Sequence, residues 1–452
     1  MSTLGTNPLL GRITRIIAEN ELAILLLASP IFLFIRPSLV PLLLLLPFLW
    51  LVRRLRWGHF VPRTPVDWSI LGLLVMVLFS TWVTPDLFTS LGKITGLLYA
   101  IAVFYALVEW GRRQEDSLPV ATLVAGLGTA TALLSLFGTR WNAKWSFLTG
   151  LNSLLPKLVG GLPGAEFGFN PNTVSGTLIT FVPLQLCVLW WLVSTQKAPD
   201  TKRRWLTWAI GLSLLATIFI IVLAQSRAAW VALALGLLSM AGIILKRFRT
   251  VFFVLVIAGI LVLIVVGPVG VSDWLVQQGL ATGTAEASWD ARVERWSRWL
   301  WAIADHPLTG TGMDVFRSQG PEMYPFFHVS VGEDLGHAHN AYLHTALDLG
   351  IPGLISYLAL LGGTIVLGWQ SYRRARQRLA QLVVLGGVAG LATHAAWSML
   401  DVLPLGARTN FMWWTVAACV ITVVIGQHWG TQQDPDPEKQ ALEPQSDRQV
   451  PA

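Results

Sequence analysis

Charged residues are scarce in this chain. Asp, Glu, Lys and Arg make up 13% of its 452 residues, whereas soluble globular domains carry about 25%. So little charge cannot cover the water-facing surface of so long a chain, which excludes a cytosolic enzyme and an intrinsically disordered protein. Cysteine is also rare. Cys187 and Cys419 both lie in apolar runs, so the sequence shows neither a disulfide framework nor a thiolate site.

Apolar residues, in contrast, make up 54% of the sequence and are gathered in long runs. About 20 apolar residues in a helix cross the roughly 30 Å hydrocarbon core of a bilayer. The runs therefore predict an all-α polytopic integral membrane protein with about twelve transmembrane helices. They lie near residues 20–35, 38–52, 66–84, 93–110, 119–137, 173–195, 205–224, 228–246, 250–268, 341–368, 379–402 and 410–428.

Basic residues indicate how these helices are oriented. Cytoplasmic loops of membrane proteins collect Lys and Arg, so orientation explains the formal net charge of +7 better than nucleic acid binding does. The clusters recur after every second run, which predicts that both termini are cytoplasmic. They lie near residues 12–15, 53–56, 112–113, 202–204, 246–249 and 373–378.

This orientation divides the chain into four parts. Residues 1–268 are expected to form helices 1 to 9, with an external loop at about 138–172. Residues 269–340 form a large external, periplasmic loop between helices 9 and 10, and residues 341–428 form helices 10 to 12. Residues 429–452, rich in Pro, Gln and Asp, are expected to be a disordered cytoplasmic tail. No internal repeat is evident.

The large external loop contains one strongly amphipathic segment, residues 285–305. Its Arg side chains can bind lipid phosphate at the membrane surface, or they can bind a phosphorylated substrate. We expect the apolar face to comprise Trp289, Val293, Trp296, Leu300 and Ile303, and the remaining surface to carry Arg292, Arg295 and Arg298.

Arg227 follows a very tight external turn at Gln225-Ser226, between two apolar runs. It stands at the N-terminus of a helix, where unpaired backbone N–H groups favour an anion. One interpretation is a side chain that reaches a lipid headgroup. The other is that Arg227, together with Arg292 or Arg295, binds a phosphate or diphosphate, for which the planar guanidinium is well suited.

Histidines gather just before the tenth run, at His337, His339 and His344. A metal site, packed or capping histidines, and a general base are the three interpretations. Metal is disfavoured because no external carboxylate or cysteine stands at an obvious ligand spacing. Two further pairs, His344 with Asp348 and His394 with Asp401, are expected to share helix faces and to support a polar cavity beneath the loop. His306 and His328 are also placed on the external side.

Three stretches together resemble the O-antigen ligase and polymerase family of bacterial membrane glycosyltransferases. Residues 225–230, Gln-Ser-Arg-Ala-Ala-Trp, match its S-R-x-A-W pattern. Residues 292–296 and 305–312 match R-x-x-x-W followed by D-x-P-L-x-G-x-G. Residues 337–343 and 349–353 match A-H-N-x-x-L followed by L-G-I-P-G. Asn170-Pro171-Asn172 resembles another recurrent element, and the resemblance covers about residues 172–365.

The resemblance implies a function and a role for each matching residue. Such enzymes move a glycan from an undecaprenyl-diphosphate-linked donor to an acceptor hydroxyl, on the external face of the cytoplasmic membrane and with inversion expected. Arg227 and Arg292 would bind the diphosphate, with Arg295 in reserve, and His339 would be the base. We also expect supporting roles for His337, Asn340, Asn172 and His344, of which His337 has no firmly assigned role in the family. No cofactor and no metal is expected.

Several alternatives stay open on the sequence. Ligases, polymerases and protein O-oligosaccharyltransferases share these motifs, so the acceptor is the lipid A core of lipopolysaccharide, another glycan or a protein. Membrane lipids are expected contacts, and nucleic acid is not. Relatives in photosynthetic bacteria have been described as bicarbonate transporters, which makes anion transport the main competing function. Paired repeats, typical of transporters, are not evident, and a non-catalytic scaffold would leave the external Arg and His residues unexplained.

Overall fold

The computed structural model describes residues 8–34, 37–141, 150, 168–195, 200–278, 285–327 and 337–429. These residues form helices and no strand, apart from one isolated bridge between Thr139 and Phe169. The all-α expectation is therefore confirmed. Most of the predicted loop 138–172, nearly all of the predicted tail, and His328 lie outside the described residues.

The N-terminal helices are α1 (Pro8–Glu19), α2 (Glu21–Leu27), α3 (Ser29–Leu33), the 3₁₀ helix η1 (Pro37–Leu44), α4 (Leu45–Trp57), α5 (Asp67–Val83), α6 (Leu87–Gly111) and α7 (Leu118–Gly138). The central ones are α9 (Pro171–Leu178), α10 (Val182–Ser194), α11 (Thr201–Ala224), α12 (Arg227–Ile244), α13 (Lys246–Val265) and α14 (Gly267–Gln277). The last are α15 (Ala285–Asp305), α16 (Phe316–Met323), α17 (Ala341–Arg374), α18 (Arg378–Trp397) and α19 (Phe411–Trp429).

Within the described residues, eight helical segments are long and apolar enough to cross a membrane. Two shorter apolar helices, Asp67–Val83 and Phe411–Gln427, accompany them. Large apolar side chains stand exposed on such helices, for example Trp82 at 85% and Leu134 at 69%. That much exposed apolar surface needs a lipid environment, so the chain is a membrane protein. The full number of spans and their orientation stay predictions.

Two predicted spans are interrupted. The first, at 20–35, consists of α2 and α3, which meet at Ala28. The sixth, at 173–195, consists of α9 and α10. In both cases a proline, Pro30 or Pro183, occupies the first turn of the second helix. Proline lacks the N–H that would continue the helical hydrogen bonds, so it begins a helix better than it extends one.

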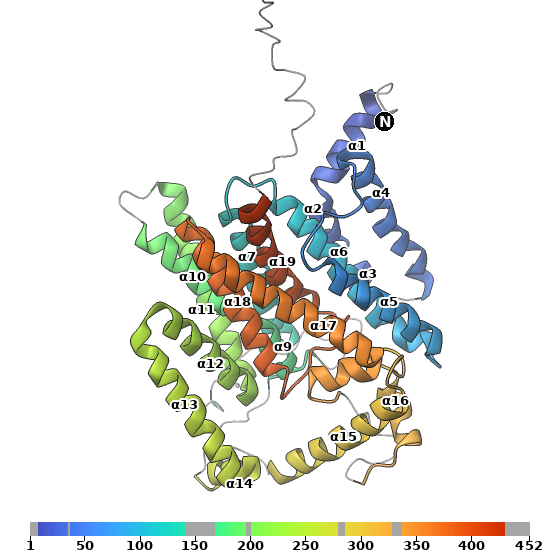
Figure 1. Cartoon of the computed structure of the whole chain (residues 1–452), viewed down its shortest axis with the longest axis vertical. Coiled ribbons are helices and arrows are strands. Elements are labelled where there is room, and N and C mark those ends of the chain that lie inside the picture. Colours follow the sequence, from blue (N-terminus) through green and yellow to red (C-terminus); the bar gives the residue numbers. More distant parts are fainter. Residues whose placement is uncertain are drawn as a thin grey trace, which may run out of the picture.

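The most deeply buried helices are α6, α10, α18 and α19, which form the centre of the bundle. α10 and α18 approach closely because Gly386 lies against the backbone of Pro183 and Leu184, where a Cβ atom would not fit. α15 and α16 lie at the end of the bundle opposite to α1, with α15 running across that end from α14 toward α16 (Figure 1). This end carries the predicted site.

Candidate active site

His339 is held in a constrained backbone position just before α17. Its φ is +49°, in the left-handed region that few non-glycine residues adopt. The next residue, Asn340, is the N-cap of α17, and its side-chain oxygen accepts hydrogen bonds from the backbone N–H groups of Tyr342 and Leu343, both at 3.0 Å. The cap starts the helix here and fixes the residue that precedes it.

Three further hydrogen bonds fix the backbone around His339 from two directions. Trp296 of α15 donates its indole N–H to the carbonyl of Ala338 at 2.7 Å. On the other side, the Asn340 amide donates to Met399 O at 3.1 Å, and Ala341 N donates to Ser398 O at 2.8 Å. The segment is therefore held between α15 and the connection from α18 to α19.

Asp401 is the side-chain partner of His339. The distance from His339 Nδ1 to Asp401 Oδ1 is 3.1 Å, and Val402 N also donates to that oxygen at 2.9 Å. With the carboxylate ionised, Nδ1 carries a proton and donates it, which leaves the lone pair of Nε2 for other chemistry. The His339 side chain is 27% exposed and that of Asp401 is 9% exposed, so the imidazole is accessible while its partner is buried.

The expected pairing of His394 with Asp401 is wrong. α18 ends at Trp397, so Asp401 lies beyond the helix and does not share a face with His394. His394 is instead buried and stacks on Trp413, with ring centroids 5.9 Å apart. Asp401 was therefore missed as the partner of His339, because the helix end that turns it toward His339 leaves no periodic pattern in the sequence.

Three arginines lie close to this pair. Arg227 is exposed and begins α12, directly after Gln225 (φ +51°) and the N-cap Ser226. Arg292 lies on α15, where burial lowers its pKa and the Asp401 carboxylate opposes that change. The charges of Arg227 and Arg295 lower the pKa of Arg292 further, so all of these groups lie within electrostatic range of it. We call Arg227, Arg292, Arg295, His339 and Asp401 the Arg–His cluster.

The apolar face of α15 differs from the expected one. Its buried apolar residues are Trp299, Ala302 and Ile303, which pack with Phe316 and Leu347, whereas Val293 and Leu300 are 47% and 53% exposed. One side of the helix packs on α17, and another side carries exposed apolar residues. Because both sides are apolar, the sequence periodicity alone does not identify the buried one. The side chain of Trp289 lies outside the described residues.

Arg298 has a structural role on the same helix. It is 8% exposed, donates from Nε to Pro325 O at 2.9 Å and lies 3.5 Å from Glu294. Its guanidinium also stacks over Trp301, 4.6 Å from the ring centroid. These contacts commit it to holding the segment after α16, so it is not part of the Arg–His cluster.

Two glycines explain why the D-x-P-L-x-G-x-G and L-G-I-P-G motifs occur together. Gly310 (φ +70°) lies against the backbone of Leu347, and Gly350 (φ +71°) lies against the backbone of Leu308. Two backbone hydrogen bonds join these two segments of the chain. Thr311 N donates to Leu347 O at 2.8 Å, and Ile351 N donates to Pro307 O at 2.7 Å. This double contact, which we call the glycine latch, fixes the end of α15 to α17.

We expect Gly310→Ala to destabilise the protein by about 1–3 kcal/mol. An added Cβ would meet Leu347 O at 2.5 Å in a backbone conformation that alanine adopts poorly. Thermal unfolding in detergent measures the change. The matched control is Gly211→Ala in α11, where a Cβ meets nothing within 4 Å and the better helix former leaves stability equal or raised. Equal midpoints for the two variants would contradict the latch.

Three expected residues remain: His337, His344 and Asn172. His337 and His344 face each other, with ring centroids 5.4 Å apart, and His344 Nε2 lies 3.4 Å from Asp348 Oδ2. Burial is the main cause that holds the pKa of His337 well below its usual range, so this imidazole is neutral. Asn172 lies in the first turn of α9, which contacts α11 and α12.

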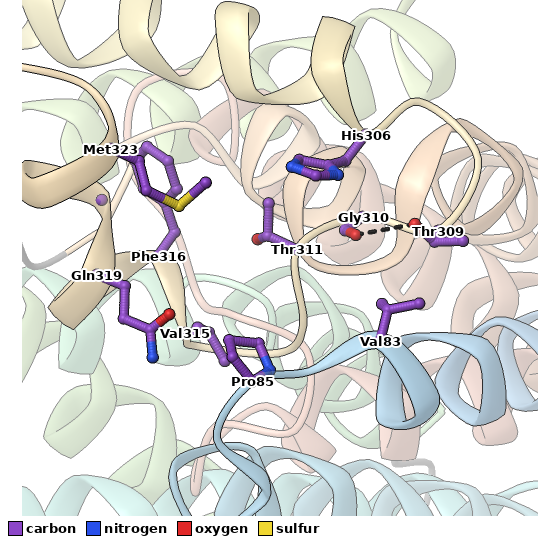
Figure 2. A pocket seen from close by; sticks show the side chains of 11 residues that line it. Val83, Pro85, His306, Thr309, Gly310, Thr311, Val315, Phe316, Gln319 and Met323 are labelled. Carbon is purple, nitrogen blue, oxygen red and sulfur yellow. Dashed lines mark hydrogen bonds between the residues drawn. The ribbon is translucent and has the colours of Figure 1, made fainter.

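A separate cavity of about 270 Å³ lies at the same end of the molecule. Val83 and Pro85 line one side of it, and His306, the Gly310 loop and α16 line the other (Figure 2). Its walls are mainly apolar, and no member of the Arg–His cluster contributes to it. We therefore place the candidate site at the Arg–His cluster and not at this cavity.

Comparison with known proteins agrees with the sequence motifs. Residues 210–358 match the family model described as O-antigen ligase. This segment runs from α11 to α17 and includes the three arginines and His339, whereas Asp401 lies beyond it. No curated protein matches the chain significantly. Over residues 210–358 the chain is therefore similar to the O-antigen ligase family.

Proposed function

We propose that the protein is a glycosyltransferase that moves a glycan from an undecaprenyl-diphosphate-linked donor to an acceptor hydroxyl. The O-antigen ligase domain supports a role of this kind in O-antigen assembly. The observation that carries the finer proposal is the position of Arg292. It lies near two other arginines and near the Asp401 carboxylate, which is bound to His339. The same place therefore offers positive charges that can bind a diphosphate and an imidazole that can accept a proton.

The reaction follows from this arrangement. His339 Nε2 takes the proton of the acceptor hydroxyl as its oxygen attacks the anomeric carbon of the donor sugar. The bond from that carbon to the diphosphate oxygen breaks, and undecaprenyl diphosphate leaves with the electron pair. Arg227, Arg292 and Arg295 neutralise the charge that develops on the departing oxygen. Attack opposite the leaving group inverts the anomeric centre.

The proposal also covers the membrane face on which transfer occurs and the acceptor of the glycan. The end of the bundle that carries α15 faces the periplasm, and the chain lies in the cytoplasmic membrane, where the lipid-linked donor is delivered. Val293, Leu300 and Trp301 leave an exposed apolar strip on α15, which fits contact with lipid beside the site. The acceptor is a hydroxyl of the lipid A core, of another glycan or of a protein.

The test is transfer by the purified protein in detergent, with a lipid-linked oligosaccharide as donor and candidate acceptors supplied one at a time. We expect one acceptor to become glycosylated while undecaprenyl diphosphate is released in equal amount. Deletion of the gene, followed by analysis of which surface glycoconjugate disappears, selects the acceptors to be tried. Release of undecaprenyl diphosphate without any glycosylated product would contradict the proposal.

Asp401→Asn should lower turnover about 10–100-fold, the usual cost of removing the partner that orients a functional histidine. The amide can donate to Nδ1 and so favours the tautomer whose proton is on Nε2, which cannot act as the base. Donor affinity should change little. The measurement is kcat and donor KM for Asp401→Asn beside Asp401→Glu, which keeps the carboxylate and should retain more turnover. Equal activity of the two variants would argue against an orienting role.

A further inference from the structure

A second cluster of ligand-type side chains lies beside the glycine latch, apart from the Arg–His cluster. Asp314, His337 and His344 each present one potential ligand atom, and these atoms all lie within 4.8 Å of one another. They come from three places in the chain: the loop before α16, the segment before α17 and the first turn of α17. Asp348 adds a second carboxylate, 3.4 Å from His344 Nε2.

The polar atoms of this cluster are buried and poorly satisfied. Among the described residues, Asp314 Oδ1, His337 Nδ1, both ring nitrogens of His344 and Asp348 Oδ2 are shielded from solvent and make no hydrogen bond. A buried polar group without a hydrogen bond destabilises the fold. Several such atoms directed at one another are therefore expensive, unless a shared partner binds them together.

The donor set matches a transition metal better than any other partner. Two imidazoles and one or two carboxylates are common ligands of Zn²⁺, at about 2.0–2.2 Å. Ligand atoms around such a tetrahedral ion are roughly 3.4 Å apart. The ligand atoms of Asp314, His337 and His344, which lie within 4.8 Å of one another, can reach that separation by small side-chain movements. Mg²⁺ and Ca²⁺ prefer all-oxygen sites, which this cluster is not.

Lys93 and Arg317 both lie within electrostatic range of His337, so both compete with a metal ion here. The Lys93 ammonium lies 3.5 Å from Asp314 Oδ1 but makes no hydrogen bond to it. A bound divalent ion would hold both carboxylates in the ionised form. It would displace the Lys93 ammonium from Asp314 Oδ1, the oxygen beside which that ammonium lies.

We propose that Asp314, His337, His344 and Asp348 bind one divalent transition-metal ion, Zn²⁺ by its donor set, that holds the segment before α17 to the loop after α15. Asp314, His337 and His344 supply three converging ligands, and a rotation of Asp348, 3.4 Å from His344 Nε2, would supply the fourth. Four protein ligands leave no open coordination position, which would make the site structural. His337 is two residues from His339, so the ion restrains the backbone that carries the proposed base. The proposal does not depend on the proposed function.

The sequence disfavours a metal site because no carboxylate stands at ligand spacing from the histidines. The fold supplies one from a distant part of the chain. The glycine latch brings Asp314 to them from the end of the preceding loop, where Gly312 docks against Thr84 and Ser90 donates to Met313 O at 2.9 Å. Asp348, one helical turn after His344, had been assigned to a polar cavity.

The test begins with metal analysis of the full-length protein purified in detergent without chelators. We expect about one zinc per chain in the wild type, and well below that in His344→Ala and Asp314→Asn. His306→Ala, a histidine at the same end but outside the cluster, should keep the wild-type content. After chelator treatment, added Zn²⁺ should raise the thermal midpoint of the wild type and leave that of His344→Ala unchanged.

Lys93→Met tests whether Lys93, and not a metal ion, neutralises the charge of the cluster. Removing the competing ammonium should maintain or increase zinc affinity, measured by competition with a coloured chelator. If the wild type holds no stoichiometric metal and its midpoint does not respond to Zn²⁺, the proposal is overturned. No donor or acceptor is used in these measurements, so that result would leave the proposed glycosyl transfer untouched.

Discussion

His339→Ala is expected to lower turnover about 10²–10⁴-fold, which is the usual contribution of a positioned proton acceptor. Among the described members of the Arg–His cluster, His339 presents the accessible proton acceptor, because the arginines are donors and the 9% exposed Asp401 carboxylate is already bound to His339 and Val402 N. Donor binding and folding should remain close to those of the wild type. Rates with saturating lipid-linked donor and a separate donor-binding assay measure the two effects.

Two histidine controls make this result specific. His306→Ala, at the rim of the separate cavity (Figure 2), should retain full turnover. His337→Ala should cost less turnover than His339→Ala, and its loss should accompany a lower thermal midpoint. The reverse order would mean that His337 is the base. Full turnover of His339→Ala would show that His339 is not the proton acceptor.

Arg292→Ala is expected to lower kcat/KM about 10²–10³-fold, the range found when one preorganised donor to a developing oxyanion is removed. The donor KM should rise as well, since the diphosphate is already charged in the ground state. Arg227→Ala should act in the same direction and more weakly, because Arg227 is more exposed. Arg292→Lys keeps the charge but loses the paired hydrogen bonds, so an intermediate rate is expected.

Arg204→Ala is the matched control for these variants. Arg204 lies in the first turn of α11, at the opposite end of the helix from Arg227, and is also exposed. It should leave both parameters unchanged. A uniform loss across Arg204, Arg227 and Arg292 would indicate a general effect of charge on membrane insertion or on donor partitioning, and would contradict a local diphosphate site.

The sequence predicted the features that are local in the chain. Apolar runs of about 20 residues located nearly every long helix, and the turn at Gln225-Ser226 was located from its position between two runs. The three motifs contain the arginines and the histidine of the Arg–His cluster. Those motifs work because each encodes a local requirement: a helix N-terminus at Arg227, an N-cap at Asn340, and close backbone contact at Gly310 and Gly350.

Features that depend on tertiary structure could not be obtained in this way. The pairing of His339 with Asp401 joins residues separated by 62 positions and depends on where α18 ends. The buried face of α15 depends on its contact with α17, while its apolar exposed strip reflects a second environment. The approach of Asp314 to His337 and His344 depends on the glycine latch.

The position of Asp401 beyond residue 358 has a consequence for engineering. The segment matched by the family model contains the arginines and the proposed base but not the carboxylate bound to it. A chimera that exchanges only residues 210–358 between relatives would therefore combine the proposed base of one parent with the orienting residue of the other. Such grafts should be cut after residue 410, so that the whole connection from α18 to α19 is exchanged together with the rest of the site.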